Sequence, residues 1–251
     1  MSPKSARYVV LPSPKAVLVT GASGGIGRAI CGAFGHAGWF VGVHYHCNKI
    51  DADRILRQVV RDGGAGALFE ADIRNPQSVQ SMVVNFCRLV AVPSVFVCAA
   101  GIGSGRLLLK QSLEEWTNVI ATNLTGTFSC LRAMAAPLLE HGGGSIIVVG
   151  SYAGFHGTIG QAAYAASKSG LIGLVKTAAK EWGSRNVRVN LVLPGWHKTR
   201  MSKGALPGDV GWDDHALHRP PSMDEVSQTV LYLAQLKDVS GQVWNCDSRD
   251  L

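Results

Sequence analysis

A tyrosine and a lysine in this chain have the spacing that acid–base chemistry requires. Tyr164 and Lys168 lie four residues apart in a helix-length segment, so they share one face of the expected helix. A phenol with a pKa of about 10 is a poor acid at neutral pH, and a neighbouring ammonium would lower that pKa. Ser151 follows an apolar run, where its hydroxyl could donate to a carbonyl oxygen. Taken alone, the Tyr and Lys are more typical of an ordinary helix surface, and the Ser of a cap, than of a catalytic site. Together they fit proton transfer to a carbonyl group.

Glycines after the first apolar run indicate a dinucleotide site. Residues 20–27 read Thr-Gly-Ala-Ser-Gly-Gly-Ile-Gly and lead directly into a helical segment. Glycine permits a tight turn there and lets backbone N–H groups at a helix start approach a pyrophosphate. Tight turns also use glycine, but a strand and a helix flank this cluster, as the motif requires. The predicted contacts in this turn are Gly21, Ser23, Gly25, Ile26 and Gly27.

The end of the second apolar run bears on which dinucleotide fits. An acidic residue about 20 positions beyond the glycines would hold the ribose 2′-hydroxyl of NAD, and residues 41–49 contain no Asp or Glu. A carboxylate there would repel a 2′-phosphate, so its absence favours NADP. His46, Asn48 and Lys49 could donate to that phosphate, although solvated polar residues at a strand end would look the same. We therefore predict NADP (NADPH) as the cofactor, with Tyr45 also in contact and NAD as the less favoured alternative.

Short apolar runs alternate with helix-length segments along the whole chain. Runs such as Val95–Cys98 are apolar on both faces, as in strands that are covered by helices on both sides. The alternation predicts an α/β fold: a single-domain, Rossmann-type, doubly wound parallel sheet of seven strands with helices on both faces. The expected strands are Ala16–Thr20, Phe40–Tyr45, Ala67–Asp72, Ser94–Ala99, Ser145–Ser151, Arg188–Leu193 and Gln242–Asp247. The expected helices are Gly25–Ala37, Lys49–Asp62, Pro76–Val90, Leu113–Glu140 (as two helices), Gln161–Ser184 and Ser222–Gln235.

Length and composition exclude several classes of protein. The 251 residues are 47% hydrophobic and 16% charged, which excludes a disordered chain. We expect residues 1–14 to be a flexible N-terminal segment and residues 15–251 to form one dinucleotide-binding and catalytic domain. Within it, residues 196–221 lack periodicity and are rich in Gly, Pro, His and Asp, as is typical of a substrate lid.

The charge and apolar patterns also bear on partners and compartment. The net charge is +7, but no basic stripe with interleaved aromatic residues indicates a nucleic-acid partner. No run approaches the ~20 apolar residues that span a bilayer, and the N-terminal apolar run is too short for a signal peptide. We expect a soluble cytoplasmic protein. Six cysteines without a C-x-x-C pair are then expected to be reduced core residues. His44 and His46 lie two apart without a third ligand, so no metal site is predicted.

From Ala16 to Asp247 the chain resembles the short-chain dehydrogenase/reductase family. The glycine turn matches the family motif, Ala99-Ala100-Gly101 matches its Asn-Ala-Gly in part, and Pro194-Gly195 matches its Pro-Gly. The resemblance implies a catalytic set of Asn123, Ser151, Tyr164 and Lys168. It places Asn123 in a kinked helix, with a bound water that completes a proton relay through Lys168. The further cofactor contacts it implies are Asp72 and Ile73 near the adenine, then Ala99, Gly101, Tyr164, Lys168, Pro194, Gly195, His197 and Thr199.

Within that family the chain is most similar to the 3-oxoacyl-[acyl-carrier-protein] reductases. The similarity covers Tyr164–Gly173, Arg188–Gly195 and Gly241–Val243. It implies NADPH-dependent reduction of a ketone, a 3-oxoacyl thioester, to a secondary alcohol in fatty acid biosynthesis. It also implies a homotetramer, with Arg185 as a contact for acyl carrier protein. A second docking arginine is missing near residue 142, and residues 245–251 depart from the usual Asp-Gly-Gly ending.

Two alternatives stay open from the sequence. One is a short-chain dehydrogenase for another small alcohol, ketone or sugar. The other is a binding protein of the same fold that senses a dinucleotide. The complete set Asn123, Ser151, Tyr164 and Lys168 favours an enzyme, because a sensor has no need of a proton donor.

Overall fold

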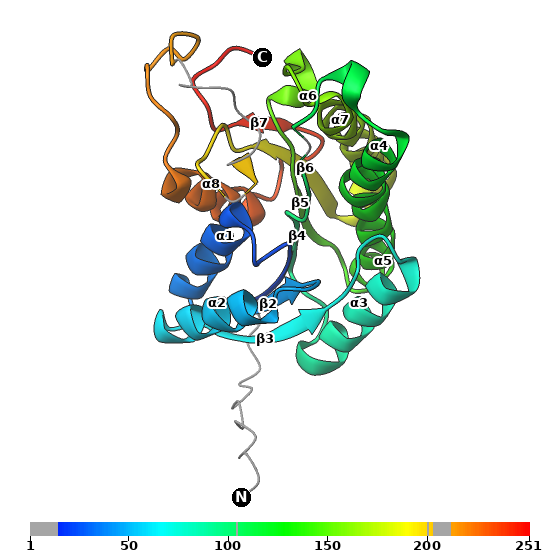
Figure 1. Ribbon diagram of the computed structural model, residues 1–251. Helices are drawn as coiled ribbons and strands as arrows, with labels where there is room; N and C mark the ends of the chain where they lie inside the picture. The colour runs from blue at the N-terminus through cyan, green and yellow to red at the C-terminus, as the bar shows by residue number, and fades with distance from the viewer. Residues whose placement is uncertain (1–14, 104, 200, 203–211) are drawn as a thin grey trace, which may run out of the picture.

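Seven parallel strands form one sheet in the order β3-β2-β1-β4-β5-β6-β7 (Figure 1). The computed structural model describes residues 15–103, 105–199, 201–202 and 212–251. The strand order reverses between β1 and β4, which creates a crevice at the carboxyl ends of these strands. The strands are β1 (Ala16–Thr20), β2 (Phe40–Tyr45), β3 (Ala65–Glu70), β4 (Val95–Cys98), β5 (Gly144–Val149), β6 (Val187–Leu193) and β7 (Val243–Asn245). The predicted doubly wound parallel sheet is confirmed.

The central strands are buried on both faces because their side chains alternate between two apolar layers. In β1, Leu18 packs into one core cluster while Val17 and Val19 pack into the other. Gly42 in β2 leaves room for a helix side chain, since a Cβ there would lie 2.5 Å from Phe86. This two-sided burial is why these strands are continuous apolar runs in the sequence.

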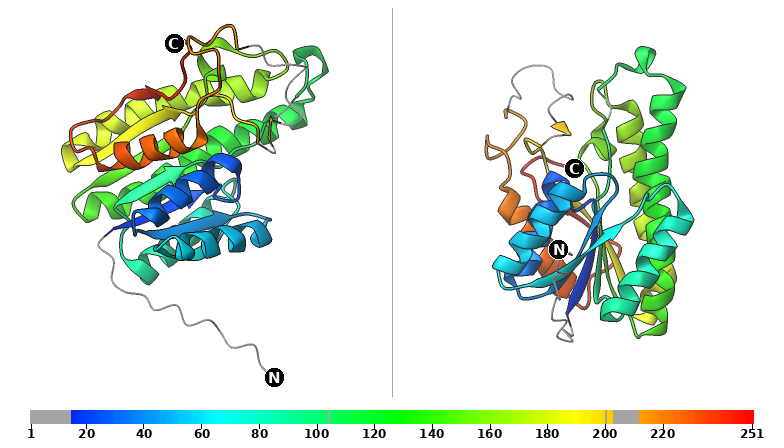
Figure 2. Two further views of the ribbon diagram at one scale, coloured as in Figure 1. Left: turned by 90° about the vertical axis from the view of Figure 1, so that its left-hand side faces the viewer. Right: turned by 60° about the horizontal axis from the view of Figure 1, so that its bottom comes forward.

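Helices cover both faces of the sheet, as the views in Figure 2 show. Helices α1 (Gly25–His36), α2 (Lys49–Arg61) and α8 (Met223–Gln235) lie on one face. Helices α3 (Pro76–Val90), α4 (Leu113–Ile120), α5 (Gly126–Glu140) and α7 (Ala162–Trp182) lie on the other. Helix starts follow capping rules: Asn75 caps α3 ahead of a proline, and Ser112 with Glu115 forms a capping box on α4.

The segment expected as two helices, Leu113–Glu140, is one helical rod interrupted by a π-turn. Residues Ala121–Thr125 form this turn between α4 and α5, and the backbone stays helical on both sides. Two short elements were not predicted, the 3-10 helix Leu108–Lys110 and helix α6 (Ala153–His156). Both are too short to produce a periodic pattern in the sequence.

Several predicted boundaries and exposures differ from the structure. Strand β5 ends at Val149, so Ser151 lies beyond it, and β3 ends at Glu70 because its register follows β2. Cys47 is exposed, so the prediction that all six cysteines are core residues is wrong for it. Residues 1–14, expected to be flexible, lie outside the described residues, as do residues 200 and 203–211 of the predicted lid. No helix among the described residues is long and apolar enough to cross a membrane.

One hydroxyl ties β1 to β4 at the carboxyl edge of the sheet. Thr20 Oγ1 donates to the Val97 carbonyl at 3.3 Å and accepts from the backbone N–H of Ala99 at 3.2 Å and Ala100 at 3.4 Å. Thr20 is fully buried, so water cannot replace these bonds. Ala99 takes the place of the asparagine in the Asn-Ala-Gly motif that residues 99–101 resemble. The side chain that links the two strands here is that of Thr20.

We predict that Thr20→Val lowers the free energy of unfolding by about 1–3 kcal/mol, because two partly buried N–H groups lose their acceptor while side-chain shape is kept. Chemical denaturation measures the change. Thr229→Val is the matched control, because Thr229 is only half-buried and its hydroxyl donates to the Glu225 carbonyl of its own helix α8. Equal losses in the two variants would contradict the structural role of Thr20.

Candidate active site

The glycine turn after β1 has backbone geometry that side chains would block. Gly21 has φ +64°, and a Cβ there would lie 2.5 Å from the Ala100 Cα. A Cβ at Gly27 would lie 2.3 Å from the Gly21 carbonyl oxygen. Helix α1 begins after Gly24 with no side chain capping its first turn. The N–H groups of this turn can therefore bind an anion, and the turn fits the pyrophosphate of a dinucleotide.

The loop after β6 lies directly over this turn. A Cβ at Gly25 would lie 2.6 Å from Cγ2 of Thr199, so glycine is what allows the two segments to approach. The loop is held by Ser202, whose Oγ accepts from the Thr199 N–H at 2.8 Å and donates to the His197 carbonyl at 2.9 Å. The structure thus brings Thr199, predicted from the far end of the sequence, to the glycine turn.

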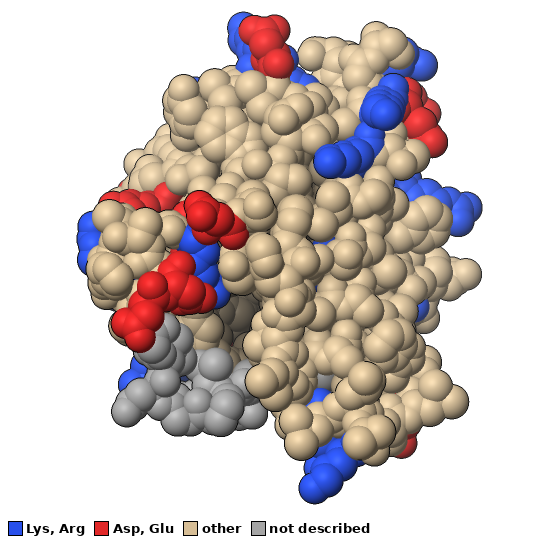
Figure 3. Space-filling view, turned by 90° about the horizontal axis from the view of Figure 1, so that it is seen from above, with Lys and Arg blue, Asp and Glu red and all other residues tan. Residues whose placement is uncertain are grey.

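A cleft of about 1260 Å³ opens at the carboxyl ends of β1, β2, β3 and β4. Seen from above this edge, the surface of the molecule is hollowed (Figure 3). The predicted cofactor contacts that line the cleft are Gly21, Ser23, Gly25, Ile26, Gly27, Tyr45, His46, Asn48, Asp72, Ile73, Ala99, Gly101 and Thr199. They come from five segments of the sequence. Their convergence makes this cleft the candidate cofactor site.

Other predicted contacts lie outside the lining of this cleft, among them Tyr164 and Lys168 on α7. Pro194, Gly195 and His197 also lie outside it. His197 Nε2 is 2.8 Å from the Pro194 carbonyl oxygen, and burial lowers the pKa of this imidazole. Gly195 has φ +75°, and a Cβ there would lie 2.5 Å from Pro221. These residues shape the loop after β6.

Three of the four predicted catalytic residues, Ser151, Tyr164 and Lys168, lie beyond β5 and on α7. The Lys168 Nζ is buried, donates to the Val149 carbonyl at 2.7 Å and lies 5.7 Å from the centroid of the Tyr164 ring. Burial lowers the pKa of Lys168 to about 8. Burial raises the pKa of Tyr164, and a hydrogen bond with Ser151 opposes that rise. Desolvation therefore outweighs any lowering of the phenol pKa by Lys168, and the net shift is opposite in direction to the predicted one.

Asn123 lies in the π-turn, where a helix distortion was expected. Its Oδ1 accepts from the Ile102 N–H at 2.8 Å, and its Nδ2 donates to the Ile102 carbonyl at 2.9 Å and to Ser167 Oγ at 3.1 Å. Gly101 lies between it and the lysine, since a Cβ there would be 3.2 Å from Asn123 Oδ1 and 3.8 Å from Lys168 Nζ. The structure brings Asn123 and Lys168 together around Gly101.

At the opposite end of the cleft, two predicted cofactor contacts already have partners. Asn48 Oδ1 accepts from the Asp51 N–H at 3.1 Å and caps α2. The Tyr45 hydroxyl donates to Glu70 at 2.9 Å. His46 is more accessible, and its Nε2 lies 3.7 Å from an oxygen of Asp72.

Sequence reasoning missed Arg74, whose guanidinium lines the cleft. Arg74 donates to both oxygens of Asp72 and, at 3.1 Å, to Asn118 Oδ1. The hydrogen bond from Arg74 lowers the pKa of Asp72 to about 2. The sequence does carry a signal for it, because Arg74 lies two residues after Asp72, a predicted cofactor contact at the end of an expected strand. The other arginines that line the cleft are Arg28, Arg54 and Arg61.

His44 was also missed as a structural part of the site. It is 2% exposed and joins three strand ends, because its Nδ1 accepts from the Gly21 N–H at 2.9 Å and its Nε2 lies 3.0 Å from the Ala71 carbonyl oxygen. These bonds require a neutral ring with the proton on Nε2. Burial lowers the pKa of His44 to about 4. A polar residue within the apolar run Val41–Tyr45 was the available signal.

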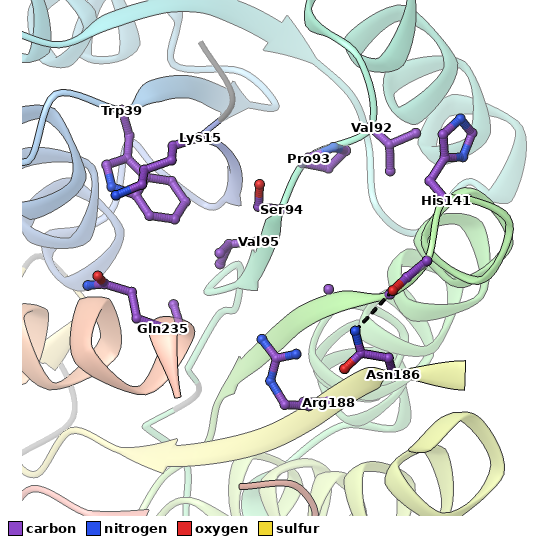
Figure 4. A pocket seen from close by; sticks show the side chains of 14 residues that line it. Lys15, Trp39, Val92, Pro93, Ser94, Val95, His141, Asn186, Arg188 and Gln235 are labelled. Carbon is purple, nitrogen blue, oxygen red and sulfur yellow. Dashed lines mark hydrogen bonds between the residues drawn. The ribbon is translucent and has the colours of Figure 1, made fainter. Parts of the chain in front are cut away.

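A second cavity, of about 490 Å³, lies at the opposite edge of the sheet (Figure 4). Arg188 from the start of β6 and Trp39, just before β2, lie on different sides of it. None of the predicted site residues lines it. Ligands of open parallel sheets bind at the carboxyl ends of the strands, and this cavity lies at the amino ends. The larger cleft is therefore the candidate site.

Comparison with known proteins supports the same interpretation. The sequence model of the family described as short chain dehydrogenase matches residues 15–209. A 3-oxoacyl-[acyl-carrier-protein] reductase of Synechocystis sp. is 37% identical over 233 residues, which are 92% of this chain and 94% of that protein. A reductase of the same name from Staphylococcus epidermidis is 35% identical over 235 residues, or 91% of this chain and 95% of that protein.

Solved structures share the fold under different names. A structure from Sinorhizobium meliloti 1021, reported under the name of a short-chain alcohol dehydrogenase, has a TM-score of 0.86 at 24% identity and covers 94% of this chain and 96% of that one. A structure from Brucella melitensis 16M, reported as a ribose-5-phosphate isomerase, has a TM-score of 0.84 at 30% identity and covers 94% and 92%. Fold likeness alone therefore does not decide the reaction.

The buried His44 predicts an acid-sensitive stability. Its pKa falls from 6.5 to about 4 on folding, so below pH 6.5 the unfolded chain binds a proton that the folded protein does not. The free energy of unfolding should fall by about 3 kcal/mol between pH 6.5 and pH 4, a loss absent above pH 6.5. Urea denaturation of His44→Gln should show a flatter dependence over that window. His36→Gln, at an exposed position on α1, is the control, and an unchanged slope in His44→Gln would refute the assignment.

Proposed function

Because the chain belongs to the short chain dehydrogenase family, we propose that it is an NADPH-dependent oxidoreductase that reduces a ketone to a secondary alcohol. We propose a 3-oxoacyl thioester as the ketone, as in the names of the reductases that are 35% and 37% identical. The observation that carries the proposal is the half-buried Tyr164, which is hydrogen-bonded to Ser151 and lies next to the ammonium of Lys168, beyond the end of the cleft.

The chemistry follows from what each side chain can do. A dinucleotide held by the glycine turn and the cleft would supply a hydride to the carbonyl carbon, so that negative charge would develop on the carbonyl oxygen. Tyr164 donates its phenolic proton to that oxygen, which completes the new O–H bond as the C=O π bond is lost. Ser151 donates a hydrogen bond that orients the carbonyl. Lys168 stabilises the phenolate that forms when Tyr164 loses its proton. Asn123, fixed by the Ile102 backbone, keeps the residues around Lys168 in place.

Charge in the cleft supports NADP over NAD. The arginines that line it favour an anionic cofactor, and two of its carboxylates have partners: Asp51 with Arg54 at 3.0 Å, and Asp72 with Arg74 at 2.7 Å. The end of β2 carries no carboxylate that would repel a 2′-phosphate. The half-exposed His46 is the side chain that we propose to approach that phosphate.

Carrier docking, assembly and compartment stay predictions. Arg185, the predicted contact for acyl carrier protein, donates to the Leu139 carbonyl at 2.8 Å and so helps to end α5, while the rest of its exposed guanidinium faces outward. Tetramer formation would cover apolar side chains that the single chain exposes, such as Phe128 on α5 and Trp116 on α4. A cytoplasmic location follows from the proposed role.

The experiment that tests the function is NADPH oxidation with a panel of carbonyl compounds. Acetoacetyl thioesters of coenzyme A and of acyl carrier protein should be reduced with higher kcat/KM than simple ketones or sugars. Preference for a non-thioester ketone would move the chain to another dehydrogenase activity. Binding of NADPH without reduction of any compound would favour the sensor alternative.

For the cofactor we predict that NADPH binds at least tenfold more tightly than NADH, a difference of about 1.4 kcal/mol. Cys47 is exposed next to His46, so Cys47→Asp places a carboxylate at the end of β2 without disturbing the core. It should weaken NADPH binding and leave NADH binding unchanged or stronger, because it repels only the 2′-phosphate. Cys47→Asn is the neutral control of the same shape, and fluorescence titration gives the dissociation constants. Equal affinity of the unmodified protein for both cofactors would refute the choice.

For the reaction we predict that Tyr164→Phe lowers kcat by about 10²–10⁴-fold with little change in NADPH affinity, because only the proton donor is lost. Lys168→Ala should lower kcat and also weaken NADPH binding, because we propose that its ammonium touches both the phenol and the nicotinamide ribose. Tyr232→Phe, at an exposed position on α8, is the matched control. Steady-state kinetics and equilibrium titration separate the two effects, and wild-type kcat in Tyr164→Phe would exclude the mechanism.

A further inference from the structure

The C-terminal tail folds into a tight turn at the carboxyl edge of the sheet. Asn245 closes it, since its Nδ2 donates to the Arg249 carbonyl at 2.8 Å and its Oδ1 accepts from the Asp247 N–H at 3.2 Å. The Arg249 N–H in turn donates to Asp247 Oδ1 at 3.2 Å. Figure 1 shows this red segment at the same end of the molecule as α6, above the carboxyl ends of the strands. The tail thus has a defined conformation close to the candidate active site.

Within this turn Arg249 and Asp247 form a buried ion pair. The Arg249 Nε donates to Asp247 Oδ2 at 3.0 Å, and its Nη2 donates to the same oxygen. The Asp247 side chain is fully buried and that of Arg249 is 14% exposed. Charges removed from water in this way are held firmly only where they are paired and hydrogen-bonded. The guanidinium is therefore fixed in position.

The segment of the predicted lid after residue 211 is attached to the tail. His215 is 1% exposed, with Nδ1 2.7 Å from Asp214 and Nε2 3.3 Å from Asp247. The backbone N–H of Ala216 donates to the Ser248 carbonyl at 3.1 Å. The tail is thereby held from a second side, which further restricts Arg249.

Arg249 extends from the tail to the residue that follows Ser151. Its guanidinium carbon lies 3.9 Å from the centroid of the Tyr152 ring, a close cation–π contact. The Tyr152 ring also stacks on His156 at 4.3 Å. Tyr152 is the N-cap residue of α6, and Ser151 Oγ accepts from the Ala153 N–H at 3.2 Å in the same turn. The contact therefore bears on the backbone that carries the Ser151 hydroxyl.

Helix α6 needs such support because it has only four residues. A helix of that length is not stable by itself, since nucleation is unfavourable and few backbone bonds form. Contacts from outside must then fix its start and the orientation of Ser151. Arg249 supplies one of these contacts from about 100 residues away in the sequence.

We propose that Arg249 is a positioning residue for Ser151, acting through the face of the Tyr152 ring. This inference rests on the proposed function, in which Ser151 orients the substrate carbonyl. Arg249 does not itself touch the reacting atoms. Loss of the contact should lower kcat more than NADPH affinity, because the cofactor cleft lies elsewhere.

A double-mutant cycle tests the coupling between the two side chains. Arg249→Met should lower kcat by about tenfold, with the dissociation constant for NADPH within twofold of the unmodified value. Tyr152→Leu should lower kcat similarly, and the double variant should fall no further. Arg249→Lys, which keeps the cation but not the planar stack, should recover part of the loss. Arg88→Met, at an exposed position on α3, is the control. Multiplying losses in the double variant, or wild-type kcat in Arg249→Met, would overturn the proposal.

A second measurement does not depend on activity. Amide hydrogen exchange at residues 151–157 should be faster in Arg249→Met than in the unmodified protein or in Arg88→Met. Tyr152→Leu serves the same purpose if Arg249→Met fails to fold, because it leaves the ion pair with Asp247 intact. Unchanged exchange in the variant that folds would overturn the proposal. If the unmodified protein reduces no ketone, faster exchange would still support the contact, and only the proposed function would fail.

Discussion

The carboxyl end of β1 is held by one close backbone approach and two side-chain contacts, and the rest of the site depends on them. Gly21 turns the chain with a positive φ against the backbone of Ala100, while its N–H is held by His44 from β2. The adjacent Thr20 hydroxyl holds the segment after β4. Because β1 lies between β2 and β4, these bonds fix the positions of the carboxyl ends of the three strands relative to one another. This arrangement sets the position of the cleft, of the start of α1 and of the segment around Gly101.

Two largely buried cations at this edge of the sheet, Lys168 and Arg249, differ in how their charge is compensated. On the side of α7, Lys168 donates to the Val149 carbonyl, and no carboxylate among the described residues forms an ion pair with its ammonium. Burial lowers the pKa of Lys168, and an anion beside the ammonium would stabilise its charged form. In the tail, Arg249 lies against a buried carboxylate, and its charge is satisfied internally. Lys168 can therefore interact with a bound anion, whereas the ion pair of Arg249 and Asp247 makes the tail rigid.

The fold was predictable because burial on both faces leaves a strong local signal. Runs such as Val95–Cys98 have no polar side, so their role as inner strands follows from composition alone. Gly27 could be named because it has a fixed place in a strand-turn-helix pattern, and Thr199 because the chain resembles a family whose motif places a threonine there. His44, Arg74 and Arg249 could not be assigned, because their roles arise from partners that only the folded chain brings near. The direction of the Tyr164 pKa shift also depended on burial, which spacing does not reveal.

The π-turn at Ala121–Thr125 has a consequence for how the sequence can change in length. A π-turn holds one more residue than an α-turn, and each residue of a helix rotates the following side chains by about 100°. Deleting one residue here would restore a regular helix. It would also rotate Cys130, Leu131, Met134 and Leu138, which now face the sheet, toward solvent or neighbouring helices. A change in the length of this rod should therefore disturb the core more than a single substitution does, and homologous chains should align across it without gaps.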